Sequence, residues 1–250
     1  MDRIAYEMFA RMEDRHFWFV ARKRIFHALL DRELGTRKDL RLLDVGCGAG
    51  SMLGPMQRYG TVHGVDLDVE SVQWCRNRGF ENVQQGSAYD LPHPDASFDL
   101  VGLYDTIEHI PDDHRALAEA FRVLKPGGLL FVSAPAYQFL WSQNDRIAHH
   151  HRRYSRGRLR RLIEDAGFEV RRATYFNTVL LPLIVPAVYW QKLLDRLGRL
   201  PSGYNNCSVP IPGPVNALFT ALMGSERLVL RHCNLPLGHS LIAIARKPQP

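Results

Sequence analysis

Short apolar runs alternate with amphipathic stretches over residues 40 to 174. The apolar runs predict strands at 40–45, 61–66, 81–85, 98–103 and 128–134. Apolar positions at helical spacing predict helices at about 50–59, 69–78, 112–124 and 155–166, and a further strand follows the helix-ending Gly167. Because strands and helices alternate, we expect an α/β fold with a doubly wound, mostly parallel sheet.

Helical segments flank this core on both sides. Residues 2–34 place apolar and aromatic side chains at helical spacing, and Gly35 ends that pattern. An insertion at 175–238 begins with an apolar run, 178–190, which contains two prolines and is too short to span a bilayer. The predicted elements that follow are an amphipathic helix at 191–200, a loop at 201–214 and a helix at about 215–231.

The sequence therefore divides into four parts. They are an N-terminal helical segment (1–38), the α/β core (39–174), the helical insertion (175–238), and a last strand with a short tail (239–250). Three interpretations of the insertion stay open: a cap over a substrate pocket, a dimer face, or a patch lying in a membrane interface. The oligomeric state does not follow from the sequence.

Charge narrows the choice of partners. The formal net charge is +6, and residues 149–161 contain six arginines and no acid. This run is either a solvated helix face or a surface that binds a phosphate, a carboxylate or an acidic membrane. We expect no DNA partner, and RNA is not favoured because basic and aromatic residues do not alternate. The polar N-terminus and four dispersed cysteines predict a cytoplasmic protein, with contact at the inner membrane face as the alternative.

The most informative motif follows the first predicted strand. Asp44-Val-Gly46-Cys47-Gly48-Ala-Gly50 places three glycines where the backbone can turn tightly and approach a ligand. The next strand ends at Asp66, whose carboxylate can accept both hydroxyls of a ribose. The glycine spacing differs from the Gly-x-Gly-x-x-Gly of dinucleotide sites and argues against a nicotinamide-dependent oxidoreductase.

Together with Phe98-Asp-Leu-Val101 and Leu124-Lys-Pro-Gly-Gly128, this motif resembles motif I of the class I S-adenosylmethionine-dependent methyltransferases over residues 40 to 170. The resemblance implies a Rossmann-like sheet of seven strands, with 240–246 as its antiparallel member and the N-terminal helices as a lid. His16-Phe-Trp-Phe-Val-Ala-Arg22 is similar to a segment of such lids. The cofactor residues it implies are Trp18, Arg22, Asp44, Gly46, Cys47, Gly48, Gly50, Asp66, Leu67, Ser87, Ala88 and Tyr104.

The segment after the fourth predicted strand carries the candidate chemistry. Asp105, Glu108 and His109 share one side if a helical turn forms there. The segment resembles the acid-x-x-Glu-His stretch of ubiquinone-pathway O-methyltransferases and small-RNA 2′-O-methyltransferases, in which a later histidine, here His150, completes a divalent cation site. Three alternatives stay open: a cation such as Mg²⁺ on these four residues, a metal-free His109 base, or simple positioning of the acceptor.

Loops after the fifth strand complete the acceptor pocket in such folds. Trp141, Arg152, Arg153 and Tyr154 are the candidate substrate residues, and the two arginines could clamp an anionic acceptor. We therefore expect an enzyme that transfers a methyl group to a small-molecule or lipid-linked acceptor, on oxygen, with Glu108, His109 and His150 as catalytic residues. An RNA or other N-methyltransferase and a non-catalytic cofactor-binding partner protein are the alternatives.

Overall fold

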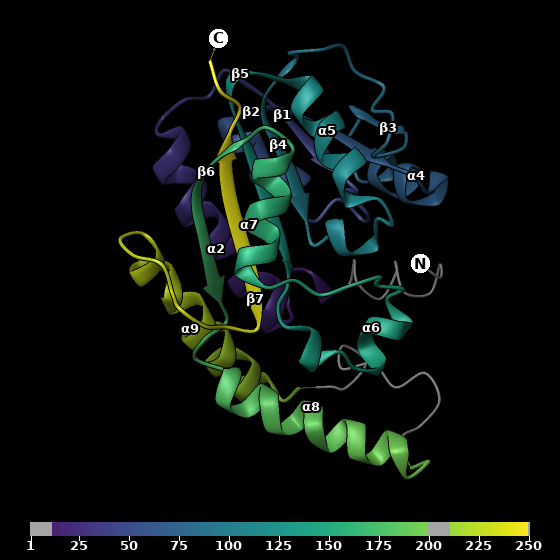
Figure 1. Ribbon diagram of the computed structural model, residues 1–250, viewed down its shortest axis with the longest axis vertical. Helices are drawn as coiled ribbons and strands as arrows, with labels where there is room; N and C mark the ends of the chain where they lie inside the picture. The colour runs from purple at the N-terminus through teal and green to yellow at the C-terminus, as the bar shows by residue number, and fades with distance from the viewer. Residues whose placement is uncertain (1–11, 200–210, 250) are drawn as a thin grey trace.

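A seven-stranded sheet forms the centre of the computed structural model, which describes residues 12–199 and 211–249. The strand order is β3-β2-β1-β4-β5-β7-β6, and of these strands β7 alone runs antiparallel to its neighbours (Figure 1). The strands are β1 (Leu40–Val45), β2 (Gly60–Asp66), β3 (Val83–Gln85), β4 (Phe98–Tyr104), β5 (Leu124–Pro135), β6 (Glu169–Phe176) and β7 (Ser240–Arg246). The predicted mostly parallel sheet is confirmed, including its antiparallel last strand.

The central strands are buried on both faces, which explains their nearly continuous apolar sequences. β5 begins at Leu124, earlier than the predicted residue 128. Leu124 pairs with Phe98, and the register then shifts so that Leu129 pairs with Leu100. The intervening Lys-Pro-Gly-Gly segment therefore lies within a bulged strand and does not precede it.

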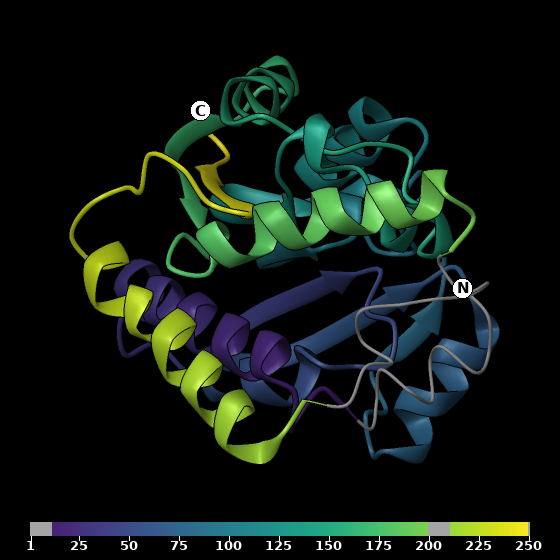
Figure 2. The ribbon, with the colours of Figure 1, turned by 90° about the horizontal axis from the view of Figure 1, so that it is seen from below.

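Helices cover both faces of the sheet (Figure 2). On one face, Leu117 of α5 (Asp113–Val123) and Ile163 of α7 (Arg156–Asp165) belong to the same buried cluster as strand residue Val132. On the other face, Phe26 of α2 (Phe17–Leu34) and Met223 of α9 (Gly213–Leu230) share a cluster with strand residues that include Phe131. The remaining helical elements are α3 (Leu53–Met56), η1 (Gln57–Tyr59), α4 (Val69–Asn77), η2 (Ile107–His109), η3 (Gln138–Leu140), α6 (Gln143–Ile147) and α8 (Leu181–Arg196).

Two of the predicted helices are wrong in extent. The helix predicted over 2–34 is interrupted at 13–16, and its first residues lie outside the described range. α2 begins only at Phe17, because the His16 imidazole accepts a hydrogen bond from the Trp18 amide and caps the helix. The helix predicted at 50–59 is reduced to the short α3 and η1, because residues up to Met52 continue the glycine-rich turn.

The insertion also differs from the prediction. The apolar run and the amphipathic helix at 191–200 form one helix, α8, with Pro182 in its first turn and Pro186 inside it. A proline in the first turn costs no helical hydrogen bond, because the first amide groups of a helix have no partner within it. The residue four positions before Pro186 is Pro182, so the bond lost at Pro186 also lies at the helix start. Residues 200–210, where most of the loop was predicted, lie outside the described residues.

Candidate cofactor and acceptor site

The candidate site lies at the carboxyl edge of the sheet, where β1 and β4 are neighbours and the strand order reverses. Ligands of open α/β sheets bind at such a point. The loop after β1 carries the three predicted glycines, Gly46, Gly48 and Gly50, all with positive φ. A side chain at Gly46 would collide with Thr106, whereas one at Gly48 would meet nothing within 4 Å. The loop therefore keeps an open backbone surface at Gly48.

Asp66 ties this loop to the next helix. Its Oδ2 accepts a hydrogen bond of 2.8 Å from the Gly48 amide, and its Oδ1 accepts one of 3.0 Å from the Asp68 amide. Burial raises the pKa of Asp66, and the two amide hydrogen bonds act in the opposite direction. The carboxylate is thus held beside the glycine loop, at the place where the sequence predicts a ribose.

A group of buried polar atoms without partners lies behind the loop. Within the described residues, Oδ1 of Asp44, the hydroxyl of Tyr104 and Nε of Arg22 are buried and make no hydrogen bond. Burial and the charge of Asp66 raise the pKa of Asp44 to about 7, while Arg22 opposes this rise. Unpartnered buried polar groups are costly in a folded protein, so this arrangement fits a polar ligand that would satisfy them.

The other predicted cofactor residues surround the same loop. Leu67 is 72% exposed directly after Asp66, and its carbonyl accepts from the Gln85 side chain. The Ser87 hydroxyl accepts a hydrogen bond of 3.1 Å from the Tyr89 amide, so part of its hydrogen-bonding capacity is already used. Ala88 packs against the core. Cys47 is a buried free thiol. Leu67 thus offers a ligand an exposed apolar side chain directly after Asp66, and Ser87 offers a hydroxyl.

α2 brings Trp18 and Arg22 to this edge. Trp18 stacks on Phe176 at 5.9 Å between ring centroids, and the Arg22 guanidinium lies 5.4 Å from the centre of the Phe19 ring. Arg22 forms an ion pair with Asp105. The pairing joins the N-terminal helix to the end of β4, across the region that holds the unpartnered atoms.

Asp105 does not share a helical turn with Glu108 and His109. It adopts a positive φ of 54°, and the helical turn after it is a 3₁₀ turn that begins at Ile107. Its amide donates to the Ser133 hydroxyl at 2.9 Å, and that hydroxyl donates back to Oδ1 of Asp105 at 3.0 Å. Asp105 is thus directed toward Arg22 and Ser133.

Glu108, His109 and His150 do come together. One ligand atom of each lies within 4.8 Å of the others, and the imidazole rings of His109 and His150 meet edge to face at 4.6 Å. Asp105 is not part of this group. The structure thus unites three of the four predicted metal ligands, and the same three predicted catalytic residues.

Burial controls the charge of this group. It raises the pKa of Glu108 well above the usual range, and the nearby Asp105 charge adds to the shift. Burial and the neighbouring His150 lower the pKa of His109 to about 3. A neutral imidazole can ligate a metal, and Oε2 of Glu108 is buried without a partner among the described residues. The donor set therefore fits a divalent cation, whose charge would favour the ionised carboxylate.

Asp145 fixes the orientation of His150. Its carboxylate is fully buried and lies 2.9 Å from Nδ1 of His150, and it accepts two hydrogen bonds from Arg153. Burial opposes ionisation of Asp145, but the hydrogen bonds from His150 and Arg153 outweigh it and lower its pKa. With Nδ1 donating to Asp145, Nε2 of His150 keeps its lone pair for a proton or a metal.

The predicted substrate residues are placed less favourably. Arg153 pairs with Asp145, and Arg152 pairs with Asp113 at 2.7 Å, so both guanidinium groups already have carboxylate partners. Tyr154 is fully buried and donates to Asp113 at 2.8 Å. Trp141 is half-buried and lines a hollow of about 270 Å³ between α6 and α8. Arg152, Arg153 and Tyr154 therefore form the wall behind the site.

Three further residues hold the side chains of this wall in place, and two of them, Asp113 and Ser133, were not predicted. Asp145, Asp113 and Ser133 fix His150, Arg152 and Asp105, respectively. For Asp145 a signal existed: Ser142-x-x-Asp145 has the spacing of a helix-capping pair, and the Ser142 amide donates to Asp145 at 2.8 Å. No local pattern marks Asp113 or Ser133, because their partners lie far away in the sequence.

Comparison with known proteins agrees with this geometry. The sequence model of a family described as "Methyltransferase domain" matches residues 43–132, which contain the glycine loop, Asp66 and the Glu108-His109 pair. Residues 43–132 thus carry a methyltransferase domain. A Mycolicibacterium smegmatis protein described as a probable S-adenosylmethionine-dependent methyltransferase is 33% identical over 165 residues, covering 64% of this chain and 62% of that protein.

A second relative of this methyltransferase domain carries the name of a reaction. The ubiquinone biosynthesis O-methyltransferase of Xanthomonas oryzae is 36% identical over 140 residues, covering 51% of this chain and 59% of that protein. The chain thus spans about three fifths of the length of these two relatives. A Haloferax volcanii protein solved in complex with the Trm112 methyltransferase activator shares the fold, with a TM-score of 0.63, 21% identity, and coverage of 99% and 98% of the two chains.

Proposed function

We propose that the protein transfers the methyl group of S-adenosylmethionine to a hydroxyl oxygen of a small-molecule or lipid-linked acceptor. One observation carries the proposal: the Asp66-bound glycine loop and the unpartnered Oδ1 of Asp44 lie at the same sheet edge as the Glu108, His109 and His150 group. A cofactor site and candidate proton-transfer groups thus face one region.

The cofactor supplies a methyl group activated by its sulfonium charge. The chain's own residues bind and orient: Asp66 and Leu67 receive the ribose and adenine, and the Gly48 backbone allows close approach. Asp44 and Tyr104 satisfy their buried polar atoms on the amino-acid end of the ligand. Positioning of this kind accounts for much of the rate of a displacement reaction.

His150 takes the proton of the acceptor hydroxyl at Nε2. The buried Asp145 holds its ring and stabilises the imidazolium that forms. Oxygen is the favoured acceptor atom because a hydroxyl needs such a base, and an O-methyltransferase is among the similar proteins. The lipid-linked acceptor class is supported by the apolar helices α8 and α9 beside this edge (Figure 2).

A divalent cation such as Mg²⁺ on Glu108, His109 and His150 is the second candidate arrangement, favoured by the closeness of their ligand atoms. A cation there would supply a lowered pKa for an acceptor hydroxyl. Titration with Mn²⁺, followed by electron paramagnetic resonance, separates the two arrangements. Binding that Glu108→Gln weakens at least about tenfold supports the cation, because a neutral amide removes the charged ligand. Absence of Mn²⁺ binding leaves His150 as the base.

The proposed function itself is tested by calorimetric titration with S-adenosylhomocysteine. We expect micromolar binding by the unaltered protein and a loss of at least about 100-fold in Asp66→Ala, because a half-buried charged hydrogen-bond acceptor is removed. Asp99→Ala is the matched control: Asp99 also accepts a backbone amide, from Arg41 at 2.9 Å, but at the opposite edge of the sheet. No binding by the unaltered protein, or equal loss in both variants, contradicts the proposal.

A further inference from the structure

The outer surface of α8 is apolar. Leu183, Trp190, Leu193 and Leu197 are all exposed, with Trp190 at 61% and Leu183 at 59%. Their spacings of seven, three and four residues place them on one side of the helix. An exposed apolar strip of this length is unusual on a free protein surface.

α9 repeats the arrangement. Val215, Leu218, Leu222 and Val229 are exposed, with Leu218 at 54%, and their spacings of three, four and seven residues again define one helix face. Most of the large apolar side chains that residues 12–199 and 211–249 expose lie in α8, in α9 or directly beside them. The exposed apolar surface of the described chain is thus concentrated on these two helices.

Four polar side chains, two on each helix, are held by hydrogen bonds or ion pairs with the rest of the protein. In α8, Lys192 donates to the Phe139 carbonyl at 2.7 Å, and Asp195 pairs with Arg146 at 2.5 Å. In α9, Asn216 accepts from the Phe17 amide at 2.8 Å, and Glu226 accepts from three backbone amides at the start of the insertion. A surface helix of a soluble domain turns its polar side to solvent and its apolar side to the core. The exposed apolar sides of α8 and α9 therefore indicate a surface that a further apolar partner covers.

Both helices lie on the same side of the molecule. They form its lower border in Figure 1 and lie in the foreground of Figure 2, which views the molecule from that side. The two helices that carry the strips are thus on one border of the molecule.

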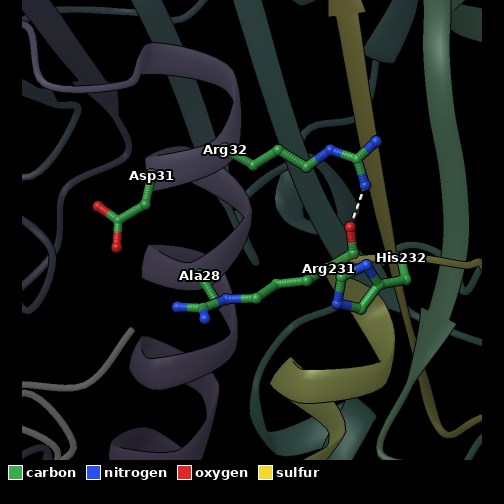
Figure 3. A pocket seen from close by; sticks show the side chains of 5 residues that line it. All are labelled: Ala28, Asp31, Arg32, Arg231 and His232. Carbon is green, nitrogen blue, oxygen red and sulfur yellow. Dashed lines mark hydrogen bonds between the residues drawn. The ribbon is translucent and has the colours of Figure 1, made fainter.

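The charges around the strips are mainly positive. The single acid of α8, Asp195, is paired, and the single acid of α9, Glu226, is buried. Arg196 and Arg199 lie at the exposed end of α8. Arg231 and His232 follow α9 and line a surface hollow of about 470 Å³ with Ala28, Asp31 and Arg32 (Figure 3). A face with apolar strips and cationic ends complements an anionic lipid surface.

We propose that α8 and α9 dock the protein on an anionic lipid membrane, with the two strips inserted at the level of the headgroups. None of the described helices is long and apolar enough to cross a bilayer, so the contact is interfacial. Trp190 and Tyr189 suit this depth, because their rings combine apolar and polar parts. A symmetric dimer through this face would bring together two surfaces that both carry an excess of positive charge, which is unfavourable. The docking does not depend on the proposed methyl transfer.

Vesicle sedimentation tests the docking. Phosphatidylcholine vesicles with and without phosphatidylglycerol serve as probes, and we expect binding to the anionic vesicles only. Arg196→Gln/Arg199→Gln should weaken that binding about 30-fold, because each surface arginine contributes about fivefold. The double variant Arg160→Gln/Arg161→Gln on α7 removes the same charge from another face and should change binding less than about threefold.

The apolar strips are tested separately. Trp190→Ser/Leu197→Ser should weaken binding at least about tenfold, while Val69→Ser, an equally exposed apolar side chain on α4, should leave it unchanged. Vesicles with brominated acyl chains should quench tryptophan fluorescence in the unaltered protein and much less in Trp190→Phe. Unchanged binding by the double serine variant, or no binding to anionic vesicles, overturns the proposal. So does a dimer in light scattering that the serine variant dissociates, which would assign the face to a second copy.

Discussion

Nδ1 of His150 lies 2.9 Å from Oδ1 of Asp145, a carboxylate that is fully buried behind the site. The same carboxylate holds the Arg153 guanidinium by two hydrogen bonds. One acid therefore sets the position of His150 and neutralises a buried cation. It connects the stability of the fold to the orientation of the proposed base.

Replacing Asp145 tests this double role. Asp145→Ala should lower the free energy of unfolding by about 3–5 kcal/mol, because Arg153 would keep its charge in a buried position without a partner. Asp195→Ala is the control: its pair with Arg146 is half-exposed, and its removal should cost at most about 1 kcal/mol. Urea titration of both variants measures the difference, and equal losses would contradict the role assigned to Asp145.

The open backbone at Gly48 yields a second prediction. Gly48→Ala should weaken S-adenosylhomocysteine binding at least about tenfold, because the methyl group would occupy the space that the loop leaves for its ligand. It should also cost about 1 kcal/mol of stability, because alanine disfavours a positive φ. Gly79→Ala shares the positive φ and the empty surroundings but lies in the turn after α4, so it should lose stability and keep binding. Calorimetry and thermal unfolding together distinguish the two effects.

The hydrogen bonds of Glu226 attach the insertion to the core, and replacing this residue tests the attachment. It accepts hydrogen bonds from the amides of Asn177, Thr178 and Val179, at 2.7 to 2.8 Å, and so joins α9 to the segment before α8. Glu226→Ala should destabilise the protein by about 3 kcal/mol or more, because three amide groups lose their acceptor. Hydrogen exchange at residues 177–179 should accelerate in this variant. Ser225→Ala, on the exposed side of the same helix turn, should leave both measurements nearly unchanged.

His239 should make the free energy of unfolding depend on pH. Burial, aided by Arg153, lowers the pKa of His239 from 6.5 to about 3. The unfolded chain therefore takes up a proton below pH 6.5 that the folded protein does not, and stability falls as the pH decreases from 6.5 toward 3. This one group contributes a slope of about 1.4 kcal/mol per pH unit near pH 5.

His239→Gln should remove that slope. Urea unfolding at pH 7.5, 6 and 5 measures it, and the difference between variant and parent should grow as the pH decreases. A difference that stays constant with pH would show that His239 has the same proton affinity in both states.

Residue patterns along the chain predicted the strands, the glycine loop and the acidic residue that surround the site. Apolar runs marked β1 and β4 because strands buried on both faces need apolar side chains throughout. Gly46, Gly48 and Gly50 and the strand-ending Asp66 were recognisable because the backbone of a tight turn and the edge of a parallel sheet constrain residue type locally. Each of these signals lies within a few residues of the feature it determines.

Only the tertiary structure decided which distant side chains meet. The sequence predicted that Arg153 binds an anionic acceptor, but in the structure its guanidinium pairs with Asp145. The sequence also predicted Asp105 as a metal ligand, but its carboxylate pairs with Arg22 of α2. The apolar positions of α8 and α9 were visible in the sequence, but helical spacing defines two faces without saying which one faces inward. That choice depends on contacts between segments far apart in the chain, such as Asn216 with Phe17, which no local pattern encodes.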